Sequence, residues 1–157
     1  MSSTDVRGKA GEAESAAGVD MNLEVVTLPV ADVDRSKAFY QSLGWRLDID
    51  LVVSDEIRNV QFTPPHSGCS IQFGKGRTAA EPGSAQAMIL VVTDIDAVRD
   101  DLVNRGVDVS EVQEMKPPGF DAPGRSYFAR ASFSDPDGNG WELQEITTRL
   151  PGRTWED

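Results

Sequence analysis

The sequence predicts an α+β fold made of two tandem βαβββ modules. The stretch LPVADVDRSKAFYQSLGW, Leu28–Trp45, is nearly repeated as LVVTDIDAVRDDLVNRGV, Leu90–Val107, at a constant spacing of 62 residues. Each copy is followed by three segments that alternate like strands. Five pairs of identical residues lie in register between the copies: Leu28, Val30, Asp32, Asp34 and Gly44 with Leu90, Val92, Asp94, Asp96 and Gly106. A repeat that holds both a strand and a helix indicates two copies of one unit that share a core.

The first module begins with LEVVTLPV, residues 23–30, which is apolar and β-branched like a well-buried strand. Asp32 or Asp34 then provides an N-cap for a helix, and Gly44 is a suitable C-terminal stop. The helical stripe predicted to face the core comprises Ala38, Phe39, Tyr40 and Leu43. Residues 45–53, 57–64 and 69–74 complete the module as three strands.

The second module begins with AMILVV, residues 87–92, followed by a helix over about 96–105 that ends at Gly106. Residues 107–113 are predicted as a strand, 116–126 as a long loop, 127–134 as a strand and 141–146 as the last strand. DPDGNG, residues 135–140, contains the residues that a tight turn needs.

A chain of 157 residues is typical of one domain. We expect a flexible tail over residues 1–20, one domain over 21–148 made of modules 21–75 and 86–147, and a second tail over 149–157. The N-terminal segment lacks the apolar centre of a secretory signal, so we expect a cytoplasmic protein.

Charge and composition exclude several classes of partner and site. The net charge of −11 and the lack of a Lys/Arg cluster argue against nucleic acid. No apolar run is long enough to span a bilayer, so we expect no membrane partner. Cys69 is the only cysteine, which excludes an internal disulfide and a cysteine-cluster metal site.

Strand alternation predicts which side chains face away from the helices. In the first strand Val25 and Thr27 point away from the helix, and in the fifth strand Ala87 and Ile89 do. The same rule turns Gln72 and Glu142 away from the helices in the last strand of each module, with Ser70 and Gln144 beside them. If each sheet curls, this second face lines a cup in which a ligand is expected.

These segments, together with FSDPDGNGWELQE near the end of the chain, resemble the vicinal oxygen chelate superfamily, also called the glyoxalase/bleomycin-resistance/extradiol-dioxygenase fold. The resemblance covers about Asn22–Thr148 and implies a glyoxalase-like curled sheet cup. It also implies a homodimer, because members of this superfamily commonly pair at their sheet edges.

The resemblance implies four metal positions, on the first and last strand of each module. They correspond to Val25, Gln72, Ala87 and Glu142. Hydrocarbon side chains have no lone pair to donate, so Val25 and Ala87 cannot bind a metal. We therefore expect no metal site and no cofactor, with Gln72 and Glu142 alone able to hold at most a weak divalent ion.

Two functions remain open at this point. The first is metal-independent binding of a small hydrophobic or aromatic molecule, of the resistance or sequestration type. The second is a glyoxalase-like lyase or isomerase in which Glu142 is the general acid or base, as a desolvated carboxylate with a raised pKa. Glu142 is equally able to pair with Arg130 or Arg125 and be structural. The enzymatic status is therefore left undecided.

The candidate ligand-binding residues come from the cup face and from the loop that follows the second helix. The aromatic residues considered for ligand contact are Trp45, Phe62, Phe120, Tyr127, Phe128 and Trp141, and Trp141 is expected in the core. Phe120 lies in a loop with no obvious core to join and is expected to cover the ligand. The predicted ligand-binding set is Val25, Thr27, Gln72, Ala87, Ile89, Phe120, Tyr127 and Gln144.

Overall fold

The computed structural model describes residues 18–120 and 124–150. The first module contains β1 (Val25–Thr27), α2 (Val33–Ser42), β2 (Arg46–Ser54), β3 (Ile57–Thr63) and β4 (Ser70–Lys75). The second contains β5 (Met88–Val92), α3 (Ile95–Asn104), β6 (Gln113–Glu114), β7 (Ala129–Ser134) and β8 (Gly140–Glu145). The two predicted tails lie mostly outside the described residues, at 1–17 and 151–157.

The strands form two four-stranded sheets with the same topology. Their orders are β1-β4-β3-β2 and β5-β8-β7-β6. The first strand of each module runs parallel to the last, while the other neighbours are antiparallel. The α+β class and the two βαβββ modules are therefore confirmed.

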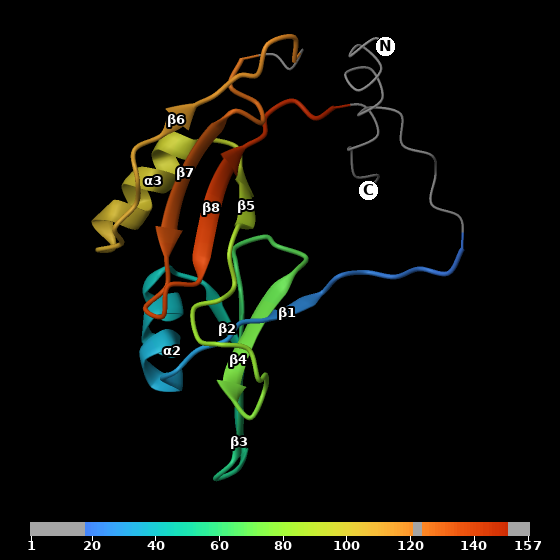
Figure 1. The fold of residues 1–157 in the computed structure, drawn as a ribbon, viewed down its shortest axis with the longest axis vertical. Coiled ribbons are helices and arrows are strands. Elements are labelled where there is room, and N and C mark those ends of the chain that lie inside the picture. The colour runs from blue at the N-terminus through green and yellow to red at the C-terminus, as the bar shows by residue number, and fades with distance from the viewer. Residues whose placement is uncertain (1–17, 121–123, 151–157) are drawn as a thin grey trace.

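The core lies on the helix side of both sheets and joins the two modules. One continuous cluster includes Tyr40 and Trp45 from the first module and Phe133 and Trp141 from the second. Figure 1 shows the two sheets one above the other, and no strand of one is hydrogen bonded to a strand of the other. Among the described residues the two sheets are therefore separate hydrogen-bonded units joined through the core. The sheets themselves are not curled, whereas the sequence had predicted a curled cup.

The repeated aspartates and glycines have the predicted structural roles. Asp32 caps α2 by accepting a hydrogen bond from the Arg35 backbone N–H at 3.1 Å. Asp94 caps α3 in the same way. Gly44 and Gly106, which follow the helices, have φ angles of 80° and 88° that favour glycine.

Two local predictions are wrong. The strand expected over 107–113 is reduced to Gln113–Glu114, because the Ser110 hydroxyl accepts a hydrogen bond from the Ser132 backbone N–H at 2.9 Å in place of a backbone carbonyl. In α2 the residue Ala38 is exposed, and Ser36 is buried instead. The other predicted stripe residues, Phe39, Tyr40 and Leu43, do lie in or against the core.

The turn between β7 and β8 does more than reverse the chain, because it connects the two modules. Asn139 is fully buried and donates from Nδ2 to the Pro29 carbonyl at 2.9 Å, ahead of α2. Asp137 accepts from the Ala31 backbone N–H at 3.1 Å. The first module is thereby fixed to the start of the last strand of the second.

A buried polar contact extends this connection into the core. The Tyr40 hydroxyl donates to Asp135 at 2.9 Å and accepts from Trp141 Nε1 at 3.0 Å. Burial, reinforced by the negative charge of Asp135, raises the pKa of Tyr40 far above its ordinary value. Tyr40 therefore stays neutral and serves as a structural link.

Across the described ranges, 18–120 and 124–150, neither helix has the length and apolarity needed to traverse a bilayer.

Candidate functional site

The open face of the second sheet changes from apolar at β5 to polar at β7. In one row Ile89 lies opposite Glu142, and Glu142 lies opposite Ser132. In the next row Val91, Gln144 and Arg130 follow one another in the same order. Ile89 and Val91 are 48% and 45% exposed, so the apolar edge of this face is uncovered in the single chain.

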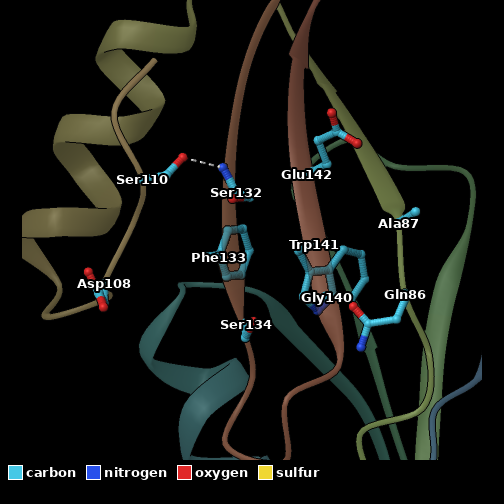
Figure 2. A pocket seen from close by; sticks show the side chains of 10 residues that line it. All are labelled: Gln86, Ala87, Asp108, Ser110, Ser132, Phe133, Ser134, Gly140, Trp141 and Glu142. Carbon is cyan, nitrogen blue, oxygen red and sulfur yellow. Dashed lines mark hydrogen bonds between the residues drawn. The ribbon is translucent and has the colours of Figure 1, made fainter. Parts of the chain in front are cut away.

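A hollow of about 650 Å³ lies over this face. Its lining includes Gln86 and Ala87 at one side, Glu142 in the middle, and Ser110, Ser132 and Ser134 at the other side. Figure 2 shows these side chains around the strands β7 and β8, with Glu142 and Ala87 near the β5 edge. The volume is within the range of small-molecule sites in proteins.

Glu142 is held by an ion pair in this hollow. Its Oε1 accepts a hydrogen bond from Arg130 Nη1 at 2.8 Å, and its side chain is 25% exposed. Arg125, the other partner considered from the sequence, pairs with Asp96 and Glu114 instead. Of the arrangements that the sequence left open, the structure therefore contains the pair with Arg130, which contacts one of the two oxygens of the Glu142 carboxylate.

The open face of the first sheet is also polar in its middle. Gln72 donates to the Thr27 hydroxyl at 2.7 Å across the β1–β4 pair and accepts from Arg77 at 3.4 Å. Val25 is 39% exposed at the edge of the same face. The Gln72 amide thus has protein partners on both its nitrogen and its oxygen.

A second polar group on this face surrounds Asp48, which sits at an irregularity in the β2–β3 pairing. Burial alone would raise the pKa of Asp48, but hydrogen bonds from Thr63, Arg46 and Gln61 outweigh it and hold the pKa below its ordinary value. Thr63 also shares a hydrogen bond with Ser70 at 2.6 Å. This part of the face is a connected and ionised network.

The four positions that the superfamily uses for metal do not fit a metal here. Val25 and Gln72 belong to the first sheet, while Glu142 belongs to the second and Ala87 directly precedes its strand β5. Ala87 has a φ of 59°, so its backbone departs from strand geometry at the position where the resemblance implies a ligand. Among the described residues, no three His, Cys, Asp or Glu side chains are grouped as metal binding requires.

The predicted aromatic surface is divided between the core and one peripheral cluster. Trp45, Phe62 and Trp141 are all buried on the helix side of the sheets. The sequence had predicted a core position for Trp141 alone. Phe120 packs edge-on against Phe128, with ring centroids 4.8 Å apart, and lies 6.4 Å from Tyr127. Phe120 therefore belongs to the peripheral cluster, where it packs on the buried ring of Phe128.

Tyr127 and Gln144 lie together at the end of the open face of the second sheet. Gln144 Nε2 donates to the Tyr127 carbonyl at 3.1 Å, and the Tyr127 hydroxyl accepts from the Leu150 backbone N–H. The structure thus groups Ala87, Ile89 and Gln144 with Glu142 on one sheet, and Val25, Thr27 and Gln72 on the other.

The polar residues of β3 and β7 were missed by the sequence reasoning. Ser132 and Ser134 line the hollow, and Gln61 and Thr63 line the face of the first sheet. The sequence did contain a signal for these serines. Residues 129–134, ARASFS, alternate between buried and exposed, so Ser132 and Ser134 lie on the other face of the sheet from Phe133. The prediction had considered only the first and last strand of each module.

Comparisons with known proteins identify the family to which this fold belongs. A family model described as "Glyoxalase/Bleomycin resistance protein/Dioxygenase superfamily" matches residues 22–143. No curated protein matches the chain.

Three solved structures illustrate the similarity. TnmS3, an antibiotic binding protein from Streptomyces sp. CB03234, is 26% identical, with 83% of this chain and 100% of that chain covered and a TM-score of 0.67. A glyoxalase/bleomycin resistance protein from the same strain is 28% identical, with coverage of 78% and 99% and a TM-score of 0.62. A lactoylglutathione lyase from Agrobacterium tumefaciens, at 16% identity, 80% and 94% coverage and a TM-score of 0.58, shares the fold.

Proposed function

The chain belongs to the glyoxalase/bleomycin resistance protein/dioxygenase superfamily, and on this premise we propose that it binds a small hydrophobic or aromatic molecule without a metal, as a resistance or sequestration protein. One observation supports this proposal above all: the superfamily's metal positions hold Val25 and Ala87, while Gln72 and Glu142 are engaged with other side chains. The antibiotic-binding function of TnmS3 is the nearest parallel among the similar structures described above.

The ligand-binding surface in this proposal is the pair of open sheet faces. The hollow supplies the volume, and the exposed side chains of Val25, Ile89 and Val91 supply apolar contact. In this proposal Thr27, Gln72 and Gln144 exchange their present hydrogen bonds within the protein for hydrogen bonds to the ligand. Phe120 and Tyr127, whose ring centroids are 6.4 Å apart, would contact the ligand from the loop side.

A second copy of the chain completes this site. The strands β1 and β5 are both sheet edges, so each has one backbone side without a neighbouring strand, and each carries exposed aliphatic side chains on the open face beside that edge. Uncovered apolar edges of this kind pair readily with another chain. A homodimer in which β1 of one copy meets β5 of the other would bring Val25 and Ile89 to one apolar floor between two polar walls.

Thermal stability tests binding and metal use together. The protein is screened against a panel of uncharged aromatic compounds in buffer with EDTA, and in a separate arm against Mn²⁺, Ni²⁺ and Zn²⁺. The proposal expects stabilisation by at least one compound that is unchanged by EDTA, because no metal takes part. Stabilisation by metals alone would contradict it.

The competing function is a glyoxalase-like lyase or isomerase that uses Glu142 as acid or base, with or without a weakly held divalent metal. The observation in its favour is the position of this carboxylate in the lining of the hollow. Glu142→Ala discriminates the two, with Glu111→Ala as a matched control on an exposed carboxylate. Stoichiometric metal in the purified protein, or a metal-induced shift that only Glu142→Ala abolishes, would favour the enzyme.

A further inference from the structure

The segment that precedes β1 extends away from the rest of its own chain. We call residues 19–24, VDMNLE, the N-terminal arm. Figure 1 shows this arm, in blue, running away from both modules on the N-terminal side of β1. Its contact with the first sheet is the hydrogen bond that the Glu24 carbonyl accepts from the Ser70 backbone N–H at 2.6 Å. Within residues 18–120 and 124–150, residues 19–23 make no hydrogen bond.

The N-terminal arm has the pattern of a strand with one apolar side. Apolar residues occupy every second position, at Val19, Met21 and Leu23, and polar residues lie between them. The relative exposures of these three residues are 89%, 94% and 75%. Val25 in β1 continues the same alternation and is 39% exposed. A period of two predicts a strand that buries one side, so the arm needs an apolar surface that its own chain does not provide.

An apolar groove lies along the outer edge of β5. It has a volume of about 370 Å³, and three consecutive residues of the strand line it, namely Leu90, Val91 and Val92. Consecutive strand residues point to opposite faces, so a groove that touches all three runs along the backbone edge. In the sheet that the structure describes, β5 is an outermost strand. The groove therefore lies where a further strand would add to the sheet.

The walls of this groove come from both modules and are almost entirely apolar. They include two prolines, at positions 64 and 65, from the loop after β3, and Ala97 and Val98 from the first turn of α3. Among the described residues that line the groove, the one charged side chain is Asp101, which pairs with Arg105 at 2.9 Å. Apolar side chains can cover such a groove without burying an unpaired charge.

We infer that the N-terminal arm of one copy of the chain adds antiparallel to the outer edge of β5 in a second copy and covers this groove. The inference rests on the proposed function, in which β1 of one copy meets β5 of the other. With Val25 beside Ile89, as in that dimer, antiparallel register places Leu23 beside Val91. The arm then continues past the end of β5 toward Ala97, where the groove lies. The parallel direction would lead it to the opposite end of the strand.

The lengths of the two segments agree with this arrangement. Residues 19–27 span about 30 Å when extended, whereas the five residues of β5 span about 17 Å. The arm is therefore long enough to pass the end of β5 and to place Met21 beside the groove, and the flexible side chain of methionine suits an irregular apolar surface. Leu23 of the second copy also lengthens the apolar floor formed by Val25 and Ile89. Each ligand site thus receives a residue from the arm of the other chain.

Disulfide formation between two different single-cysteine variants tests the contact directly. Both variants carry Cys69→Ser, so the introduced thiol is the only one in each chain. Full chains with Leu23→Cys and with Val91→Cys are co-expressed, oxidised with diamide and separated on a denaturing gel without reductant. The mixture should give a cross-linked dimer that neither variant gives alone. Val103→Cys, on the exposed side of α3, replaces Val91→Cys as the control and should give only the background level.

A second measurement asks whether the arm contributes to the stability of the dimer. The double variant Met21→Ser/Leu23→Ser should raise the dissociation constant of the dimer at least about tenfold in sedimentation equilibrium, because it removes two apolar side chains from the contact. Asn22→Ser, between these two positions, should change the constant by less than about twofold. All three residues are exposed in the single chain, so both variants should keep the circular dichroism spectrum of the original protein.

The outcomes separate this inference from the proposed function. A dissociation constant that the double variant leaves unchanged, or equal cross-linking with Val91→Cys and Val103→Cys, overturns the inference and leaves the proposed function standing. A monomeric original protein overturns the inference together with the proposed dimer. Metal-independent binding is measured separately with the aromatic panel, so failure of that panel removes the proposed function and not the contact of the arm.

Discussion

Replacing Tyr40 by Phe should destabilise the protein severely, although it removes one atom. The hydroxyl is buried and makes two hydrogen bonds, to Asp135 at 2.9 Å and from Trp141 Nε1 at 3.0 Å. Asp135 keeps the bond from Asn139 Nδ2 at 2.8 Å, but the indole N–H of Trp141 is left without a partner. The aromatic ring itself remains, so its packing against Trp45 is preserved.

The expected loss follows from these two contacts. A hydrogen bond to a charged acceptor contributes roughly 1.5–3 kcal/mol, and a buried donor without a partner costs about 1–3 kcal/mol. Because the two terms overlap, we expect a loss of about 3 kcal/mol in the free energy of unfolding. The midpoint of urea unfolding should then fall by about 1.5 M, for a slope of about 2 kcal/mol per M.

Tyr127→Phe is the matched control. Among residues 18–120 and 124–150 its hydroxyl makes one hydrogen bond, which it accepts from the Leu150 backbone N–H, so we expect a loss below about 1 kcal/mol. Urea unfolding followed by circular dichroism compares the two variants with the original protein. Equal and small losses would refute the argument that Tyr40 links the modules through a desolvated polar contact.

Two further predictions concern charge and assembly. Hydrogen bonds from Arg58 and, to a smaller extent, from Lys37 hold the pKa of Asp50 well below its ordinary value of about 4. The ionised carboxylate therefore stabilises the fold fully above about pH 4, and this stabilisation is lost as the pH falls toward the lowered pKa. Asp50→Asn should therefore lower the free energy of unfolding by about 1 kcal/mol at pH 7 and by progressively less below pH 4, as measured by urea unfolding. A difference between the variant and the original protein that stays constant with pH would contradict this. Ile89→Lys places a charge on the uncovered edge strand β5 and should lower the mass measured by light scattering from twice the chain mass to the chain mass. The control Val103→Lys, on α3, should leave the mass unchanged. If the original protein is itself monomeric, the proposed dimer is refuted.

The fold was predictable from the sequence because it depends on local signals that occur twice. Asp32 and Asp94 predict the helix starts, and Gly44 and Gly106 predict the ends, since few other residues serve in those backbone positions. Alternation gave the correct face for Ile89.

The relation between the modules was not predictable in the same way. It depends on long-range contacts such as that between Asn139 and the Pro29 carbonyl, 110 residues apart, and a turn sequence alone does not indicate them. The two modules are those predicted, but their sheets are uncurled rather than bent into the expected cup. The strand over 107–113 failed because one side chain, Ser110, took the hydrogen bond that a backbone group would have accepted.

Strand alternation predicted which side chains of the candidate site face away from the helices. It did not predict which other side chains they contact. Alternation placed Gln72 and Glu142 away from the helices, but the choice of Arg130 over Arg125 depends on which arginine reaches the face. Phe120 was expected to be free because its loop contains no periodic pattern, yet it packs on Phe128.

The central claim is that the open sheet faces bind a small molecule without a metal. The most direct measurement is an NMR titration of the isotope-labelled protein with the best compound of the panel, in buffer with EDTA. The account predicts saturable shifts of amides in β5, β7 and β8 around Ile89 and Ser132, identical after divalent metal is added. Binding that appears only with metal, or shifts confined to residues away from both open faces, would contradict it.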